Sequence, residues 1–310
     1  MSKLRIEENI SASEDLSIYM SKEWLSLFPK VRTFSILNKN DEPIGSFQIL
    51  DTKMKGQRAL ITPMFTSNVS LSVKDPSSKK VGSISHQKKV FETLAEYLKR
   101  SRAKIIDLSF PTEFQDMQAL QWSGFTVQPK YTFHIELQKS IDDLREQMSS
   151  STRANLKKAI AELTVEEKND PESFLKLCDL TFNRQNENHD RDQLEKILRS
   201  SDLGEMRSSF FVNDGKKDIA SVLVVHDNSK AYYIIGGYDH NSSHRGASTL
   251  ALWSAIEKMK NEGKLLFDMQ GSMIPAVEQF VRGFGGDKKT YFNVSRQKWY
   301  VKIARSILGK

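Results

Sequence analysis

Asp268 is the acidic residue that stands out for chemistry, because the segment around it is otherwise apolar. A carboxylate inside a buried strand needs a hydrogen-bond partner or a function. It can act as a general base or orient an amine, or it can hydrogen-bond the turn that follows at Gly271. The sequence leaves both roles open. Its neighbours in this predicted strand are Leu265, Leu266, Phe267 and Met269.

Three cations form a second candidate group on a predicted helix over residues 152–163. Arg153, Lys157 and Lys158 are spaced so that they share one side of that helix. Together they can hold an anionic donor or a nucleotide-sugar acceptor. The alternative is a solvated helix face without a ligand.

Other patterns exclude several kinds of chemistry. His240 and His244 are four residues apart, but they lie in a predicted loop without the intervening Glu of zinc hydrolases, so we expect no metal site. Cys178 falls on the apolar stripe of a predicted helix, which favours core packing over nucleophilic catalysis. No G-x-S-x-G segment of hydrolases occurs. The glycines at 283, 285 and 286 follow a predicted helix and do not open one, which excludes a Rossmann nucleotide site.

Composition places the chain among ordinary globular proteins. It has 310 residues, 38% of them hydrophobic and 27% charged, which predicts about two domains. There is no run of about 18 apolar residues, so we expect no integral membrane association, and the charged start is unlike a signal peptide. We therefore expect a cytoplasmic protein. The formal charge of +7 is spread along the chain, which argues against DNA binding.

The end of the chain is a local exception to this even charge. Residues 288–310 contain seven basic and no acidic side chains, and such an end can attract phosphate, nucleic acid or an anionic membrane. The alternative is an amphipathic helix with Trp299, Ile303 and Ile307 on its apolar side and a solvated basic side. The basic residues are Lys288, Lys289, Arg296, Lys298, Lys302, Arg305 and Lys310.

The elements that must position these residues occur in two similar series. In each half, a hairpin pattern leads to a long helix, a buried strand, a short helix, a glycine and an aromatic strand. The spacing from Asp107 to Gly124 equals that from Asp268 to Gly285. This predicts an internal repeat with a domain seam near residues 138–150, giving domains 1–140 and 141–310.

The order of elements in each half resembles the GNAT (N-acetyltransferase) fold, and the fused pair resembles the Fem family of peptidoglycan-bridge aminoacyltransferases. The likeness is carried by GGYD at 236–239, the helix with Leu250, Trp253 and Ile256, FDMQGS at 267–272, Phe280, Arg282, Phe284 with Gly285, and Tyr291. The basic segment at 148–159 is similar to the helix that leads into the second domain of such proteins. The implied fold class is α/β (α+β), with two GNAT-like domains in tandem, each a mixed twisted sheet flanked by helices.

The resemblance also implies where the ligands bind. A GNAT enzyme holds the donor pyrophosphate on a loop of the type Gln/Arg-x-x-Gly-x-Gly/Ala before its long helix. Here the best match is residues 243–248, which keep the central glycine but not the rest of the pattern. His244, Arg245 and Gly246 are accordingly the candidate cofactor-binding residues. The candidate substrate-binding residues are Arg153, Lys157, Tyr238, Ser272, Arg282 and Tyr291, and Asp268 is the candidate catalytic residue.

Taken together, these features predict an N-acyltransferase or aminoacyltransferase of the GNAT/Fem type, with its site mainly on the second domain. The resemblance implies acyl-CoA or aminoacyl-tRNA as the donor substrate, no tightly bound cofactor, and a small-molecule or peptidoglycan-precursor acceptor. Acyl transfer to an amine needs positioning and oxyanion stabilisation but no nucleophile. The alternatives are a non-catalytic GNAT-fold scaffold protein and an RNA-binding protein that uses the basic end.

Overall fold

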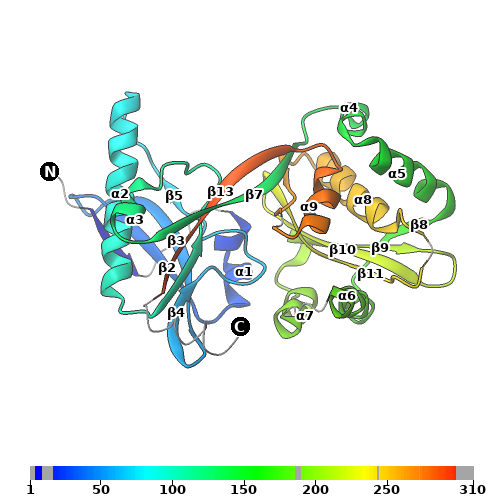
Figure 1. Cartoon of the computed structure of the whole chain (residues 1–310), viewed down its shortest axis with the longest axis horizontal. Helices are drawn as coiled ribbons and strands as arrows, with labels where there is room; N and C mark the ends of the chain where they lie inside the picture. The colour runs from blue at the N-terminus through cyan, green and yellow to red at the C-terminus, as the bar shows by residue number, and fades with distance from the viewer. Residues whose placement is uncertain (1–3, 9–16, 186–189, 243, 272, 298–310) are drawn as a thin grey trace. The chain divides into compact units, whose positions relative to one another are not determined.

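The computed structural model describes residues 4–8, 17–185, 190–242, 244–271 and 273–297 (Figure 1). The chain divides into two compact units, residues 1–130 with 290–310 and residues 131–289. The boundary therefore falls within two long strands, β7 (Thr126–Glu136) and β13 (Asp287–Gln297), and not at the seam predicted near residue 140. The residues of the predicted basic C-terminal helix, 298–310, lie outside the described part of the chain.

The first unit begins as an antiparallel meander. β2 and β3 form the predicted hairpin across the turn that contains Asp41, and β4 follows β3. The long helix α2 then leads to β6, which runs parallel to β4. The helix predicted over 113–122 is shorter than expected and begins at Gln118. The elements are β1 (Arg5–Glu8), η1 (Ile18–Met20), α1 (Lys22–Ser26), β2 (Val31–Leu37), β3 (Pro43–Met54), β4 (Gln57–Ile61), β5 (Ser72–Val73), α2 (Lys80–Arg100), β6 (Ile105–Ser109) and α3 (Gln118–Trp122).

The second unit repeats this order. β9, β10 and β11 form an antiparallel meander, α8 follows, and β12 runs parallel to β11. Ser140 and Asp143 form a capping box at the start of α4. The elements are α4 (Ile141–Gln147), α5 (Ser150–Glu162), β8 (Thr164–Glu167), α6 (Pro171–Gln185), α7 (Arg191–Arg199), η2 (Gly204–Met206), β9 (Arg207–Asn213), β10 (Asp218–His226), β11 (Lys230–Tyr238), α8 (Ala247–Asn261), β12 (Leu266–Asp268) and α9 (Pro275–Arg282).

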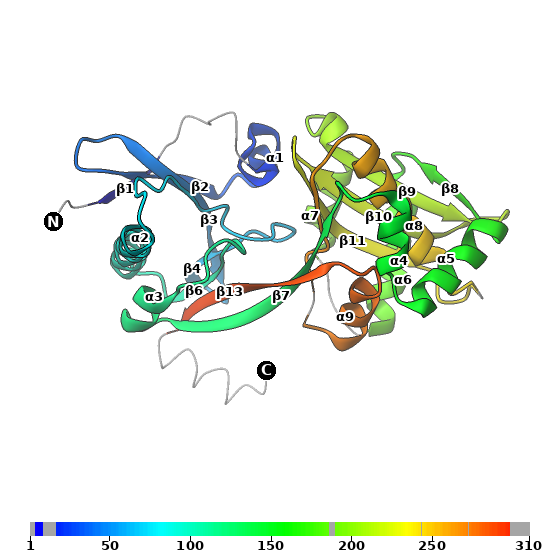
Figure 2. The same cartoon turned by 90° about the horizontal axis from the view of Figure 1, so that it is seen from above.

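The repeat extends to the order of the strands, but the two copies exchange their long strands β7 and β13, which the sequence did not predict. In the first unit β6 pairs with residues 293–297 of β13, and in the second β12 pairs with residues 134–136 of β7 (Figure 2). Each copy therefore has the long strand of the other copy beside its parallel pair. As a consequence, the order of hydrogen-bonded strands runs through β6, β13, β7 and β12.

The core of the second unit lies between its sheet and α8, with α5 packed on α8. α8 is apolar on most of its surface and buries Leu250, Trp253 and Ile256, the residues named for the resemblance. α6 packs on β11 from the other side, where a Cβ at Gly237 would lie 2.5 Å from the backbone of Leu177. This layering fixes β11 and the start of α8 in one rigid body. None of the helices described here is long and apolar enough to cross a membrane.

Candidate functional site in the second unit

Asp268 ends β12 with both of its carboxylate oxygens engaged. The Thr132 hydroxyl donates to Oδ1 at 2.5 Å, and the backbone N–H of Gln270 donates to the same oxygen at 2.8 Å. Oδ2 lies 3.5 Å from Nε2 of His134. The carboxylate is therefore held by the turn, as one interpretation of the sequence predicted, and it also faces a histidine.

Strand register explains this arrangement. Asp268 lies directly opposite His134 in the antiparallel β7–β12 pair. Phe133, Ile135 and Phe267 point into the core under α8, so the alternation of side chains along a strand turns Thr132, His134 and Asp268 to the opposite face. The fold thus gathers three polar groups from segments about 135 residues apart in the chain, which the Thr132–Asp268 separation of 136 illustrates.

His134 is the member of this group with unused hydrogen-bonding capacity. Its side chain is 11% exposed, and its Nε2 has no hydrogen-bond partner among the described residues. A buried imidazole nitrogen without a partner is costly unless a ligand or a water molecule completes it. Such a histidine beside a fixed carboxylate can take a proton from a bound amine.

The matching position in the first unit has a different environment. Asp107 is exposed and accepts a hydrogen bond from Asn293 Nδ2 at 2.7 Å. Both aspartates therefore contact the strand inserted beside them, but an amide cannot take up a proton as a histidine can. The pair suited to acid–base chemistry belongs to the second unit.

β11 offers an open edge next to this polar group. β12 pairs with β11 only as far as Tyr232, and β11 then continues to Tyr238. A β-bulge at Ile234 interrupts the register with β10, and such bulges bend a strand away from its neighbour. The chain leaves β12 through Gln270 and Gly271, both with positive φ, so it turns away from β11. Backbone N–H and C=O groups beyond Tyr232 therefore face an edge that β12 does not fill.

The equivalent edge in the first unit is closed. β4 ends at Ile61, where its pairing with β6 ends. The next residue, Thr62, keeps the two strands together: its N–H donates to the Asp107 carbonyl at 3.0 Å and its hydroxyl accepts from the Ser109 N–H at 2.8 Å. An extended ligand can add to β11, but β4 has no comparable free length.

The start of α8 lies beyond the end of β11. Its N-cap residue Gly246 supplies no side-chain cap, and of the first-turn N–H groups that of Ala247 donates to the His244 carbonyl at 3.3 Å, so the N–H groups that follow it can meet another acceptor. A Cβ at Gly246 would lie 2.4 Å from the Asn155 carbonyl, so this glycine is needed for close packing on α5. His244 Nδ1 accepts the Gly246 N–H at 3.2 Å, and its Nε2 lies 3.2 Å from Glu162. Both ring nitrogens of His244 thus face protein groups.

Positive charge gathers around this helix start. Burial raises the pKa of Tyr238, and the charges of Arg184 and Arg245 oppose that rise. Burial also lowers the pKa of His240, and Arg184 lowers it further. Arg184 and Arg245 are exposed. The loop before α8 therefore carries Arg245, and the charge of Arg184 on α6 also acts on its residues, a combination suited to a phosphate group.

The other predicted binding residues are more dispersed. Exposed Arg153 donates to the Glu146 carbonyl at 2.8 Å, and Arg282 donates to Glu278 at 3.0 Å. Lys157 is exposed, and the Tyr238 hydroxyl donates to the Ser242 carbonyl at 3.0 Å. In the described chain no hydrogen bond or ion pair links Arg153 or Arg282 to Asp268. Tyr291 belongs to the first unit, and Ser272 lies outside the described residues.

Thr132 and His134 are the site residues that the sequence analysis did not identify. The signal is present in the segment YTFHIEL at 131–137, whose alternation of apolar and polar residues indicates a strand. Alternation places Thr132 and His134 on the face opposite Phe133 and Ile135. It does not reveal which strand pairs with this one, so the link to Asp268 needed the structure.

Cys178 lies in the core, as predicted. Burial strongly raises the pKa of its thiol, and the thiolate is the reactive form. We therefore expect iodoacetamide at pH 8 to leave the native protein unlabelled. The unfolded chain in guanidinium should gain one label, because it has a single cysteine. Mass spectrometry measures both, and full labelling of the folded protein within minutes would contradict a core position.

The described residues contain no group of three or more side chains suited to a metal ion.

Among known protein families, the Acetyltransferase (GNAT) domain family matches residues 144–279 of this chain. No curated protein sequence matches the chain. The matched segment covers β9 to β12 and α8, which carry the open edge and the helix start.

Solved structures match over nearly the whole chain. The structure of FemX has a TM-score of 0.66 at 14% identity and covers 93% of this chain and 96% of its own. L-PGS from Bacillus licheniformis has a TM-score of 0.56 at 11% identity, with 90% and 89% covered. A tandem GNAT protein from the clavulanic acid biosynthesis pathway has a TM-score of 0.54 at 9% identity, with 94% and 98% covered. Residues 144–279 are therefore similar to the acetyltransferase domain of the GNAT family, and the chain as a whole has the tandem GNAT fold that its sequence resemblance predicted.

Proposed function

We propose that this chain is an N-acyltransferase or aminoacyltransferase whose donor lies along the open edge of β11. The phosphate end of the donor binds at the start of α8, beside Arg184 and Arg245. The acyl end lies near Asp268 and His134. The observation that carries this proposal is the open β11 edge that joins an anion-binding helix start to a buried histidine–aspartate pair.

The length of this edge favours a particular class of donor. Asp268 is level with Tyr232, and the start of α8 follows Tyr238. Six strand residues span roughly 20 Å. A donor must therefore carry its acyl group on an extended arm that ends in phosphate, and its amide groups can pair with β11 as an added strand would. Acyl-CoA and the end of an aminoacyl-tRNA are donors with phosphate and a reactive acyl group, whereas a short acyl phosphate lacks the arm.

The chemistry assigned to the residues is direct transfer. The nitrogen of the acceptor amine attacks the acyl carbonyl carbon, a C–N bond forms, and the bond from that carbon to the carrier sulfur or oxygen breaks. The amine loses its proton to His134, and His134 passes that proton to the departing sulfur or oxygen of the carrier. Asp268 orients the imidazole, while Thr132 and the Gln270 N–H fix the carboxylate.

The Fem-type resemblance favours aminoacyl-tRNA as the donor and a peptidoglycan precursor as the acceptor. The incomplete loop at 243–248 supports a donor other than ordinary acyl-CoA. Acyl-CoA with a small amine or sugar acceptor is the second candidate, supported by the match of residues 144–279 to the acetyltransferase domain. The scaffold interpretation differs from both because it requires no donor.

A donor screen tests the proposal. We expect acetyl-CoA, a longer acyl-CoA or an aminoacyl-tRNA to raise the Tm of the protein, since a ligand of the folded state stabilises it by mass action. Arg245→Glu should raise the Kd of that donor about tenfold or more, because a charge-assisted hydrogen bond contributes about 1.5–3 kcal/mol. The matched control is Lys196→Glu, which makes the same charge change at an exposed position of α7. No shift with any donor, together with no transfer product, would favour the scaffold.

A further inference from the structure

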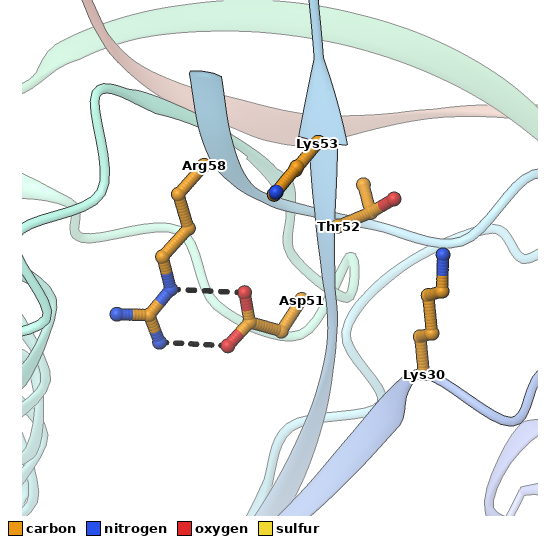
Figure 3. A pocket seen from close by; sticks show the side chains of 5 residues that line it. All are labelled: Lys30, Asp51, Thr52, Lys53 and Arg58. Atoms are coloured by element: carbon orange, nitrogen blue, oxygen red, sulfur yellow. Dashed lines mark hydrogen bonds and ion pairs between the residues drawn. The ribbon is translucent and has the colours of Figure 1, made fainter. Parts of the chain in front are cut away.

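A pocket of about 450 Å³ lies in the first unit, apart from the residues discussed so far (Figure 3). It is lined by residues from the start of β2 and from the β3–β4 hairpin: Lys30, Asp51, Thr52, Lys53 and Arg58. Its volume is in the range of small-ligand sites and exceeds what one simple anion needs. All five lining residues are polar or charged, although much of the surface that they turn to the pocket is the apolar part of their side chains.

The pocket follows an open edge of β3. In the described chain the pairing of β3 with β2 ends at Leu50 opposite Val31, and the Asp51 N–H then donates to the Lys30 carbonyl at 3.1 Å. β4 continues to pair with β3 on the other side as far as Met54. Because N–H groups alternate along a strand, the Lys53 N–H points, like that of Asp51, away from β4 and toward this open edge.

The single carboxylate in the pocket is already neutralised. Arg58 binds Asp51 through two parallel hydrogen bonds, Nε to Oδ1 at 3.0 Å and Nη2 to Oδ2 at 2.7 Å. Arg32 donates to Oδ2 at 2.9 Å. Hydrogen bonding from Arg58, followed by Arg32, lowers the pKa of Asp51, so it stays ionised and keeps both guanidinium groups in place. Arg32 is balanced in turn by Glu8.

Lys30 and Lys53 carry the charge that remains. Neither ammonium group has a carboxylate within salt-bridge distance among the described residues, and both side chains are exposed. Figure 3 shows the Lys30 ammonium and the Thr52 hydroxyl on one side of β3, and the Lys53 ammonium on the other side together with the Arg58–Asp51 pair. The hairpin that presents them is held by a tight turn with positive φ at Lys55 and Gly56. One side of the strand thus offers the Lys30 ammonium and the Thr52 hydroxyl, the open edge offers the Lys53 N–H, and the Lys53 ammonium adds a second uncompensated charge from the other side.

We propose that this pocket binds a phosphorylated small molecule. Its phosphoryl oxygens accept hydrogen bonds from the Lys30 ammonium, the Thr52 hydroxyl and the Lys53 N–H. The Lys53 ammonium adds positive charge from the other side of the strand, and the rest of the molecule occupies the remaining volume. A phosphoryl group suits the site because it offers several acceptor oxygens and a charge that matches the two lysines. The site is separate from the proposed donor site, so it does not depend on the acyl-transfer proposal.

Calorimetry with inorganic pyrophosphate tests the proposal in protein that carries Arg245→Glu, which removes the proposed phosphate contact at α8. We expect binding that the double change Lys30→Ala with Lys53→Ala weakens tenfold or more. Thr52→Val, which keeps the charge and shape but removes the hydroxyl, should weaken it several-fold. The matched control is Lys39→Ala with Lys74→Ala, two other exposed lysines of the first unit.

Three outcomes would overturn the site. Equal weakening by the control pair would show a general effect of positive charge, and unchanged binding in the Lys30/Lys53 variant would place the anion elsewhere. Binding of single-stranded RNA that depends on Lys30 and Lys53, with no binding of pyrophosphate, would assign the surface to a nucleic acid. Circular dichroism of each variant confirms that the exposed substitutions leave the fold intact.

Discussion

Replacing His134 by Gln should lower kcat for acyl transfer by about 10²–10⁴-fold, the usual contribution of a positioned general base. Glutamine has a similar reach and can still hydrogen-bond Asp268, but its amide cannot take up a proton. Because the proposed donor contacts lie along β11 and at α8, the Kd of the donor should stay within about twofold. Steady-state kinetics and donor binding, measured on the same preparation, separate the two effects.

The control for this experiment is Glu136→Gln. Glu136 lies two residues further along β7, on the same side of the strand as His134, and is exposed. Its loss should change kcat little. If His134→Gln also leaves kcat unchanged, the histidine is not the proton acceptor. If instead the variant loses donor binding together with kcat, then His134 has a structural role in the donor site.

Those features of the fold that depend on residues close together in the chain were predictable from the sequence. Asp107 and Asp268, each followed by a glycine at the same spacing, marked the two copies of one unit, and the hairpin and capping signals gave most element boundaries. The exchange of β7 and β13 was not predictable, because β13 pairs with β6 across about 186 residues of chain, as the Asn293–Asp107 contact illustrates. Hydrophobic periodicity reports which face of a strand is buried but not its partner.

The residues of the candidate site were likewise predictable only in part. A carboxylate in an apolar strand made Asp268 conspicuous, while His134 was one polar residue in an alternating strand. Only the register of β7 on β12 shows that the two face each other. Arg153 and Arg282 had the right charge for a ligand, but each is bonded to its own or the preceding helix. Charge and spacing suggest which residues can bind, and the tertiary contacts decide which are already engaged.

Gly246 has a packing role in the structure that the sequence analysis did not predict. The sequence resemblance assigned it to the phosphate loop, where a glycine lets the backbone approach a ligand. In the structure its missing Cβ lets the start of α8 approach α5, with the Asn155 carbonyl only 2.4 Å from where that atom would be. The glycine therefore sets the position of the first-turn amides, and through them the anion site.

Gly246→Ala should consequently impair both stability and donor binding. The added methyl group cannot fit without moving α8 away from α5, and such overpacking costs about 1–3 kcal/mol. The displaced helix start should then raise the Kd of the donor about tenfold, because the first-turn N–H groups of α8 would no longer be positioned to donate hydrogen bonds to the phosphate. Urea denaturation measures the loss in the free energy of unfolding, and calorimetry with the donor measures the loss in affinity.

Gly263, at the other end of α8, provides the comparison that separates these two effects. It has φ +78° and open space around its Cα, so Gly263→Ala should cost about 1 kcal/mol of backbone strain without moving the helix start. Its donor affinity should match that of the unmodified protein. If both glycine variants lose affinity equally, donor binding follows global stability and not the seating of α8 on α5. If Gly246→Ala is destabilised but binds the donor normally, the phosphate does not bind at the start of α8.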